Sequence, residues 1–164
     1  MPRLTRPFGR DEHPFVLTIA GWRDTEKTCD AGLGLIAARL APLVGLIAVG
    51  PTLPGGMIPA IAAGQLGAAR IDDVREPILQ GLIGGGMTPT LAGALVRGEF
   101  DALASAGRSP MLTFALLAWE IVTGAIVGLP DEPMGESEAT SPAEARRPSP
   151  TARPASPAST APPP

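Results

Sequence analysis

A run of glycines between two apolar helical patterns constrains this fold more than any other feature of the chain. Residues 72–96 read DDVREPILQGLIGGGMTPTLAGALV. The first half of this stretch keeps apolar residues on one helical face and then reaches the glycines. Glycine readily adopts the left-handed backbone conformation that ends many helices. The sequence therefore predicts a helical hairpin whose structural hinge is formed by four glycines: Gly81, Gly84, Gly85 and Gly86.

The residues on either side of the glycines predict how this helical hairpin closes. Asp72 is the expected N-cap of the first helix. Thr88 is the expected N-cap of the second, because Pro89 follows it at the first helical position. We expect the two helices to pack through apolar residues spaced four apart, with Ile78 and Leu82 against Leu91 and Leu95.

Two short strands are expected near the N-terminus. They cover residues 3–8 and 15–20 and are joined by residues 9–13. The second has the two-residue period of a half-buried strand. Pro7 and Pro14 confine the strands to edge positions or strand ends, because proline has no N–H to donate to a sheet. An isolated hairpin is unstable in water, so this pair must lean on helices.

The pattern changes to a helical period after Gly21. Trp22 and Cys29 lie on the apolar side, and we expect both to be core residues rather than a ligand-stacking residue and a nucleophile. Gly32 and Gly34 divide this region into two predicted helices. The second helix presents an apolar stripe formed by Leu33, Ile36, Ala37, Leu40 and Val44.

Residues 43–67 show no persistent period and mix prolines and glycines with apolar side chains. They predict a long apolar loop that contains a short helix over residues 57–63. Such a loop is uncommon inside a compact domain and indicates a contact surface.

The last helix is predicted over residues 111–127, after Ser109 as N-cap and Pro110 at the first position. It is apolar almost all round, with Thr113 and Glu120 as a polar line. A helix of this kind is buried on most sides, by the core or by a partner. Its predicted stripes are Leu112, Leu116, Trp119, Val122 and Ile126, and Phe114, Leu117 and Ile121.

Composition divides the chain into a domain and a tail. From Pro130 onward the residues are mostly Pro, Ser, Ala and Glu. They offer little to bury, so we expect residues 130–164 to be disordered. The predicted fold is mainly α (α+β): a short N-terminal hairpin and a compact set of helices over residues 1–129.

Charge and motifs exclude several function classes. The net charge of −3 argues against nucleic-acid binding. No lysine follows the glycines, so they do not form a phosphate-binding loop. The only histidine, His13, lies in an expected turn, and Cys29 is the only cysteine. We predict a non-enzyme without cofactor or metal. Capping and solvated turns account for three carboxylate pairs: Asp11 and Glu12, Asp72 and Asp73, and Asp131 and Glu132. Glu76 is expected in the first turn of its helix, where a negative charge suits the helix dipole.

Two apolar stretches have the length of a membrane span, residues 31–50 and 111–129. Each carries a charge near its middle, Arg39 in the first and Glu120 in the second. A charge at that depth costs about 3 kcal/mol on insertion scales. No apolar segment typical of a signal peptide follows the N-terminal charges. The expectation is therefore a cytoplasmic protein that does not use a membrane.

Four segments in order resemble the tail-assembly chaperone family of gene-transfer agents and prophages. They read FGRDEHPFVLTIAGWRDTEK, DAGLGLIAARL, IDDVREPILQGLIGGGMTPTLAGALV and LTFALLAWEIVTGAIVG, and together they extend over residues 8–128. Residues 81–87, around the glycines, are the most specific part. Residues 43–59 are longer and richer in proline and glycine than the family pattern, and the tail is peculiar to this chain.

This resemblance implies a transient role in particle assembly. A family member is expected to hold the tape-measure protein in solution, to bring tail-tube subunits to it and to leave before the tail is complete. An acidic, mostly helical chain with surplus apolar surface suits binding to long apolar helices. We predict that the apolar surface for such a partner comprises Ile78, Leu82, Met87, Leu95 and Trp119.

Two other functions are compatible with the sequence. In the first alternative the chain is a minor structural component of the tail, although it has few strands. In the second it is a small membrane-associated protein. The sequence leaves open the oligomeric state, including a homo-oligomer, and the partner segment that is bound.

Overall fold

The computed structural model describes residues 3–49 and 68–128. These residues belong to the first of the two units into which the chain divides, Met1–Pro130. Two predictions, a short helix over residues 57–63 and a disordered tail over residues 130–164, lie outside the described residues.

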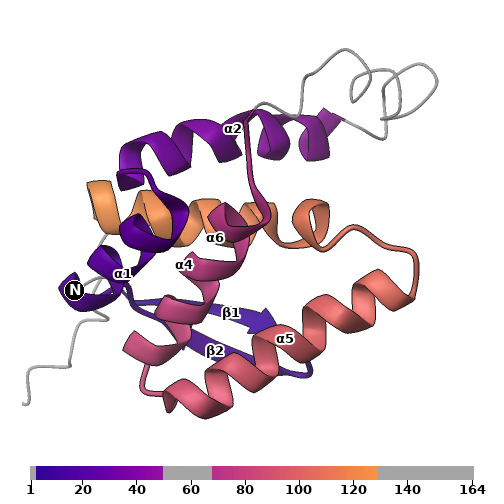
Figure 1. The fold of residues 1–164 in the computed structure, drawn as a ribbon, viewed down its shortest axis with the longest axis horizontal. Coiled ribbons are helices and arrows are strands. Elements are labelled where there is room, and N and C mark those ends of the chain that lie inside the picture. The colour runs from indigo at the N-terminus through magenta and orange to yellow at the C-terminus, as the bar shows by residue number, and fades with distance from the viewer. Residues whose placement is uncertain (1–2, 50–67, 129–164) are drawn as a thin grey trace, which may run out of the picture. The chain divides into compact units, whose positions relative to one another are not determined.

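The described part of the chain is mostly helical and begins with a two-stranded antiparallel hairpin, so the predicted fold class is confirmed (Figure 1). Its elements, in chain order, are β1 (Leu4–Phe8), β2 (Asp11–Phe15), α1 (Ile19–Cys29), α2 (Leu33–Val49), α4 (Ile71–Gly84), α5 (Pro89–Ser105) and α6 (Pro110–Val127).

The hairpin closes earlier than predicted, and the expected strand over residues 15–20 is wrong. β1 and β2 pair with Phe8 opposite Asp11, which leaves a two-residue turn. Gly9 permits this tight turn because its φ is +71°. The following residues enter a helix instead, since the Thr18 hydroxyl accepts a hydrogen bond from the Gly21 N–H at 3.1 Å and caps α1.

The predicted division between the first two helices is confirmed, and Glu26 holds it in place. Asp30 ends α1 in a left-handed conformation, with φ of 49°. The Glu26 Oε1 atom accepts hydrogen bonds from the indole N–H of Trp22 at 2.8 Å and from the Leu33 N–H at 3.2 Å. Trp22 is half-buried and packs against the core, so it acts as a structural residue that also fixes the α1–α2 corner.

Helix α2 continues to Val49, so the predicted loop is wrong over residues 43–49. Pro42 lies inside the helix on its exposed side, and the apolar pattern continues past it with Leu43 and Leu46 buried. Burial of these leucines offsets the backbone hydrogen bond that a proline removes.

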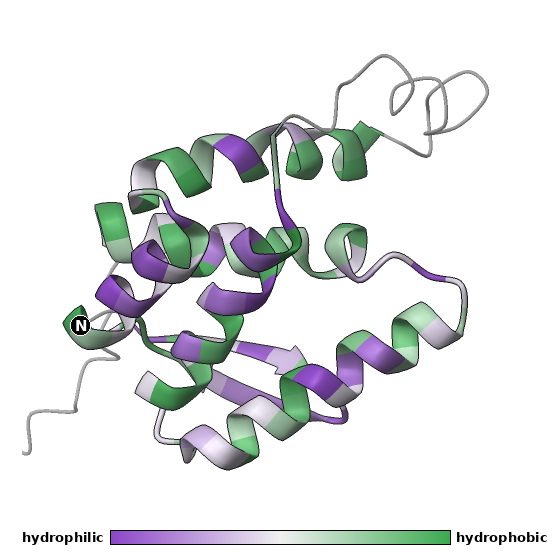
Figure 2. Ribbon diagram, in the orientation of Figure 1, coloured by the Kyte–Doolittle hydropathy of each residue, from purple (hydrophilic) through white to green (hydrophobic). Residues whose placement is uncertain are grey.

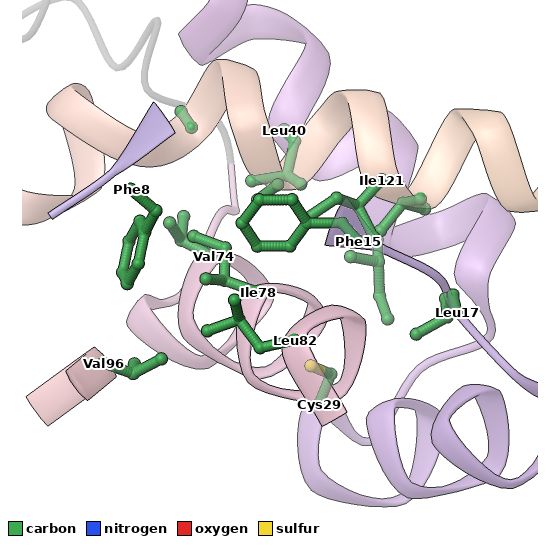
Figure 3. Close-up of a cluster of buried hydrophobic side chains, with 14 of the residues drawn as sticks. Phe8, Phe15, Leu17, Cys29, Leu40, Val74, Ile78, Leu82, Val96 and Ile121 are labelled. Carbon is green, nitrogen blue, oxygen red and sulfur yellow. The ribbon is translucent and has the colours of Figure 1, made fainter. Parts of the chain in front are cut away.

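Helix α4 is the centre of the domain, and all the other described elements contribute to the core around it. It packs most extensively against α1 and α6, and less against α5. Phe8 of β1 and Phe15 of β2 meet edge to face with ring centroids 6.4 Å apart. Figure 3 shows side chains from both strands and five helices converging: Phe8, Phe15, Cys29, Leu40, Val74, Ile78, Leu82, Val96 and Ile121.

Helix α6 buries part of each predicted stripe, with Ile121 and Val122 in the core, and it also buries residues outside both stripes. Its fully buried residues include the small Ala115 and Ala118, which let α2 and α4 approach closely. Leu116 and Ile126, which were predicted to be packed, are 45% and 43% exposed. A helix that is apolar all round has almost no preferred side, so its sequence does not select the buried face.

One helix among the described residues, α6, is long and apolar enough to cross a membrane, and α1 and α2 pass the same test as a pair bent by 67°. In this fold α6 packs against α2 and α4. The charge near its middle, Glu120, forms an ion pair with Arg6 of β1 at 2.9 Å.

Candidate protein-binding groove

The glycine hinge is a crossing point between two backbones. The Val16 N–H donates a hydrogen bond to the Gly81 carbonyl at 2.9 Å, so the link after β2 lies directly on the end of α4. A Cβ atom at Gly84 would collide with the carbonyl oxygen of Val16. A Cβ atom at Gly85 would collide with the carbonyl oxygen of Pro14. Glycine is required here because any side chain would push the hairpin off α4.

The glycines were predicted to adopt the left-handed conformation that ends a helix, and among these four glycines this prediction holds only at Gly86. Gly86 has φ of +109°, the conformation that favours glycine. Gly84 is the last residue of α4, and Gly85 is right-handed with φ of −73°. Gly81 lies inside α4, where a Cβ atom would be 3.0 Å from the Phe15 ring. Close approach, rather than left-handed geometry, explains these three glycines.

The predicted partner surface is wrong at two of its five residues. Ile78 and Leu82 are buried in the core and cannot contact a partner. Met87, Leu95 and Trp119 are half-buried and pack against the core, so their role in binding stays a prediction.

Of the two residues of α5 that were expected to pack, Leu95 packs against the core, but the fully buried residues of this helix are others. Leu91 was expected to pack against α4 but is 63% exposed. The buried positions are instead Ala92, Val96 and Phe100, which repeat every four residues. Phe100 stacks on Phe114 of α6 with ring centroids 5.2 Å apart. This narrow stripe leaves one flank of α5 separated from α4.

A groove of about 370 Å³ lies along that flank, between α4, α5 and the start of α6. Figure 2 shows hydrophilic and hydrophobic residues alternating along α5. Ligand-binding clefts in proteins are typically lined by apolar side chains with a few polar groups. The apolar lining of this groove comprises Ile71, Leu79, Val96, Phe100, Ala104 and Pro110.

Gly93, two arginines and one aspartate complete the lining, with Arg75 on α4 and Arg97 and Asp101 on α5. Arg75 lies 3.9 Å from the Asp72 carboxylate, and about half of its side chain is exposed. Arg97 forms no salt bridge with any residue that the structure describes. The groove thus combines apolar walls with a rim of charged side chains, a surface suited to another protein segment.

A second polar feature is buried between α2 and α4, and it confirms a capping role for Asp73, although this carboxylate is not solvated. Asp73 is fully buried, and its Oδ1 atom lies 3.4 Å from Arg39 Nη1. Its Oδ2 atom accepts a hydrogen bond from the Arg70 N–H at 2.8 Å, so α4 begins one residue before the predicted cap at Asp72. Glu76 is also buried and accepts a hydrogen bond from Gln80 at 2.9 Å. This cluster stabilises the fold.

Cys29 is a buried core residue, as predicted. Its thiol donates to the Asp72 carbonyl at 3.3 Å. Burial, reinforced by the nearby charges of Asp73 and Glu76, raises the pKa of this thiol to about 12. The thiol therefore stays neutral at physiological pH, which does not suit a nucleophile.

The raised pKa of Cys29 predicts a loss of stability in alkali. Below its ordinary pKa of 9.0 the thiol is neutral in the folded and in the unfolded chain. Its contribution to the free energy of unfolding is therefore fully present there. Between pH 9.0 and about 12 the unfolded chain ionises first. The free energy of unfolding is then expected to fall by up to about 1.4 kcal/mol per pH unit. Urea titrations across this range measure it; Cys29→Ala, which has no thiol, should show a shallower fall, and an equal fall would contradict the assignment.

Among the described residues, no group of His, Cys, Asp and Glu is placed to hold a metal ion. His13, expected in a turn, lies in β2 opposite Arg6. In the part of the chain that the structure describes, the groove between α4 and α5 has the properties of a binding site. Comparisons with protein families, with curated proteins and with solved structures found no match.

Proposed function

We propose that this protein is a non-enzymatic tail-assembly chaperone of a gene-transfer agent or prophage. It binds the tape-measure protein transiently in the cytoplasm and helps to recruit tail-tube subunits. The resemblance over residues 8–128 suggests the family, and the groove between α4 and α5 is the observation that carries the binding role.

The groove suits one face of a helix rather than a whole helix. An α-helix with its side chains is about 10 Å across, so a helix would lie over the groove and insert the side chains of one stripe. Leu91, on the outer side of α5, and Leu116 and Ile126 of α6 add exposed apolar surface. Long apolar helices, such as a tape-measure protein provides, need surfaces of this type to remain in solution.

Co-expression tests the proposed function. The chain is expected to move a tape-measure protein from the same gene cluster into the soluble fraction and to co-elute with it on size exclusion. Ala104→Trp fills the groove from an exposed position on α5 and should abolish this effect. Ala102→Trp adds the same ring on α5 outside the groove and should leave the effect intact. Absence of both solubility and complex with the unmodified chain would refute the proposal.

Composition of the finished particle separates a chaperone from a structural tail component. A chaperone leaves before the tail is complete, so mass spectrometry of purified particles should find the chain nearly absent. A stoichiometric amount in the particles would instead favour the structural role.

Membrane association is the third candidate, after the structural role, because α6 has the length and composition of a span. In that case the chain would stay in the membrane pellet after a carbonate wash. The chaperone proposal predicts its release.

A further inference from the structure

We infer that the groove between α4 and α5 selects a helical partner segment that carries a carboxylate beside its apolar anchor residues. This inference rests on the proposed function, because it names the chemistry of the segment that the chaperone holds.

The apolar floor of the groove indicates that the partner segment carries apolar anchor residues. Val96 and Phe100 are almost fully buried and form its base, while Ile71 is 42% exposed at its edge. A volume of about 370 Å³ accepts more than one large side chain. Apolar residues spaced three or four apart on a helix lie on one face and enter such a groove together.

The charged side chains at the rim of the groove indicate which charge the partner segment carries. Arg75 stands on the α4 side and Arg97 on the α5 side, with Asp101 as the acidic lining residue. Two arginines and one aspartate line the groove, and Asp72, which pairs with Arg75, offsets the charge of that arginine. Arg97 is therefore the lining cation that has no salt bridge with a described residue, on a chain whose net charge is −3. Opposite charges steer association and set the register of a bound segment.

Arg97 is the residue that a partner carboxylate would reach. It is exposed and has no salt bridge among the described residues, whereas Arg75 already lies 3.9 Å from Asp72. Guanidinium groups bind carboxylates through two parallel hydrogen bonds, so Arg97 selects for Glu or Asp in a partner.

The two most apolar helices of a second copy do not match the chemistry of this groove. Helix α2, with Leu35 and Val49 exposed, contains no acidic residue. Helix α6, with Leu116 and Ile126 exposed, contains only Glu120, which is paired with Arg6. These two helices therefore offer no free carboxylate to Arg97.

A displayed peptide library tests this selectivity with the full chain as bait. The peptides are amphipathic helices with fixed leucines on one face and flanking positions varied among Glu, Gln and Lys. Peptides with Glu are expected to be recovered about tenfold more often than those with Lys. Glu attracts Arg97 and Lys repels it, and the difference stays modest because an exposed ion pair contributes little to the free energy of binding. Arg97→Glu should reverse this preference. Arg23→Glu, the same change on an exposed position of α1, should preserve it.

Three results would overturn the inference: equal recovery of Glu and Lys peptides, a preference unchanged in Arg97→Glu, or no peptide retained. A dimer of the chain that Arg97→Glu disrupts would also overturn it, in favour of a second copy. The co-expression experiment is scored separately. If Ala104→Trp abolishes rescue while the library shows no charge preference, the proposed function stands and the selectivity fails. If the preference holds without any rescue, the groove binds acidic segments but the chaperone role fails.

Discussion

Replacing Gly85 with alanine is expected to lower the free energy of unfolding by about 3 kcal/mol, at the upper end of the usual cost of overpacking. The added methyl group would collide with the carbonyl oxygen of Pro14. This obstacle is backbone, so no side-chain rotation relieves it. The hairpin must move away from α4, and the hydrogen bond from Val16 to Gly81 is lost with it. Thermal or urea unfolding of the purified variant measures the change.

Gly98 provides the matched control, because it lies in α5 with open space where a Cβ atom would stand. Gly98→Ala should raise the stability by about 0.5–1 kcal/mol through helix propensity. Gly84→Ala, which meets the Val16 carbonyl, should behave like Gly85→Ala. Equal stability of Gly85→Ala and the unmodified chain would show that the backbones do not cross this closely. A stable Gly85→Val variant that lost partner binding would make the hinge an interface element instead.

Arg39→Met is expected to cost about 3 kcal/mol, because it leaves the Asp73 carboxylate buried without its charged partner. Asp73 is fully buried, and only 14% of the Arg39 side chain is exposed, so water screens this pair little. The separation of 3.4 Å is long for a charged hydrogen bond, which places the value at the lower end of the range for buried pairs. Denaturant unfolding of the variant measures this loss.

The double variant Arg39→Met with Asp73→Asn should recover much of that loss. The asparagine is neutral, and its oxygen still accepts the hydrogen bond from the Arg70 N–H. Arg75→Met, which breaks the exposed pair with Asp72, is the control and should change stability by less than about 1 kcal/mol. If Arg39→Met were as mild as Arg75→Met, the buried pair would not hold α2 on α4.

The ends and starts of several helices could be predicted, because they depend on residues close by in the sequence. Gly84 to Pro89 end one helix and start another through glycine, an N-cap and a proline. Ser109 and Pro110 start α6 in the same way, and the Ser109 hydroxyl accepts a hydrogen bond from the Leu112 N–H at 3.3 Å. Each signal depends on neighbours within four residues, so it is readable without knowledge of the tertiary contacts.

The buried faces were less predictable. On α5 a stripe through Leu91 and Leu95 looked as suitable as the one through Ala92 and Val96 that the domain buries. Helix α6 offered apolar residues in every direction. The choice depends on the shape of the neighbouring helices, where a small residue permits closer packing than a leucine. The groove was missed for the same reason, since Arg75 and Arg97 come together only when α4 and α5 are placed.

The glycines of the hinge show what the sequence determines and what the tertiary structure determines. The sequence by itself determined that the chain turns between α4 and α5, because three successive glycines and a Thr-Pro start allow no continuous helix there. Only the tertiary structure decided why Gly84 and Gly85 must be glycine. The Pro14 and Val16 carbonyls that exclude a side chain lie about seventy positions away along the chain, and folding alone brings them against the end of α4.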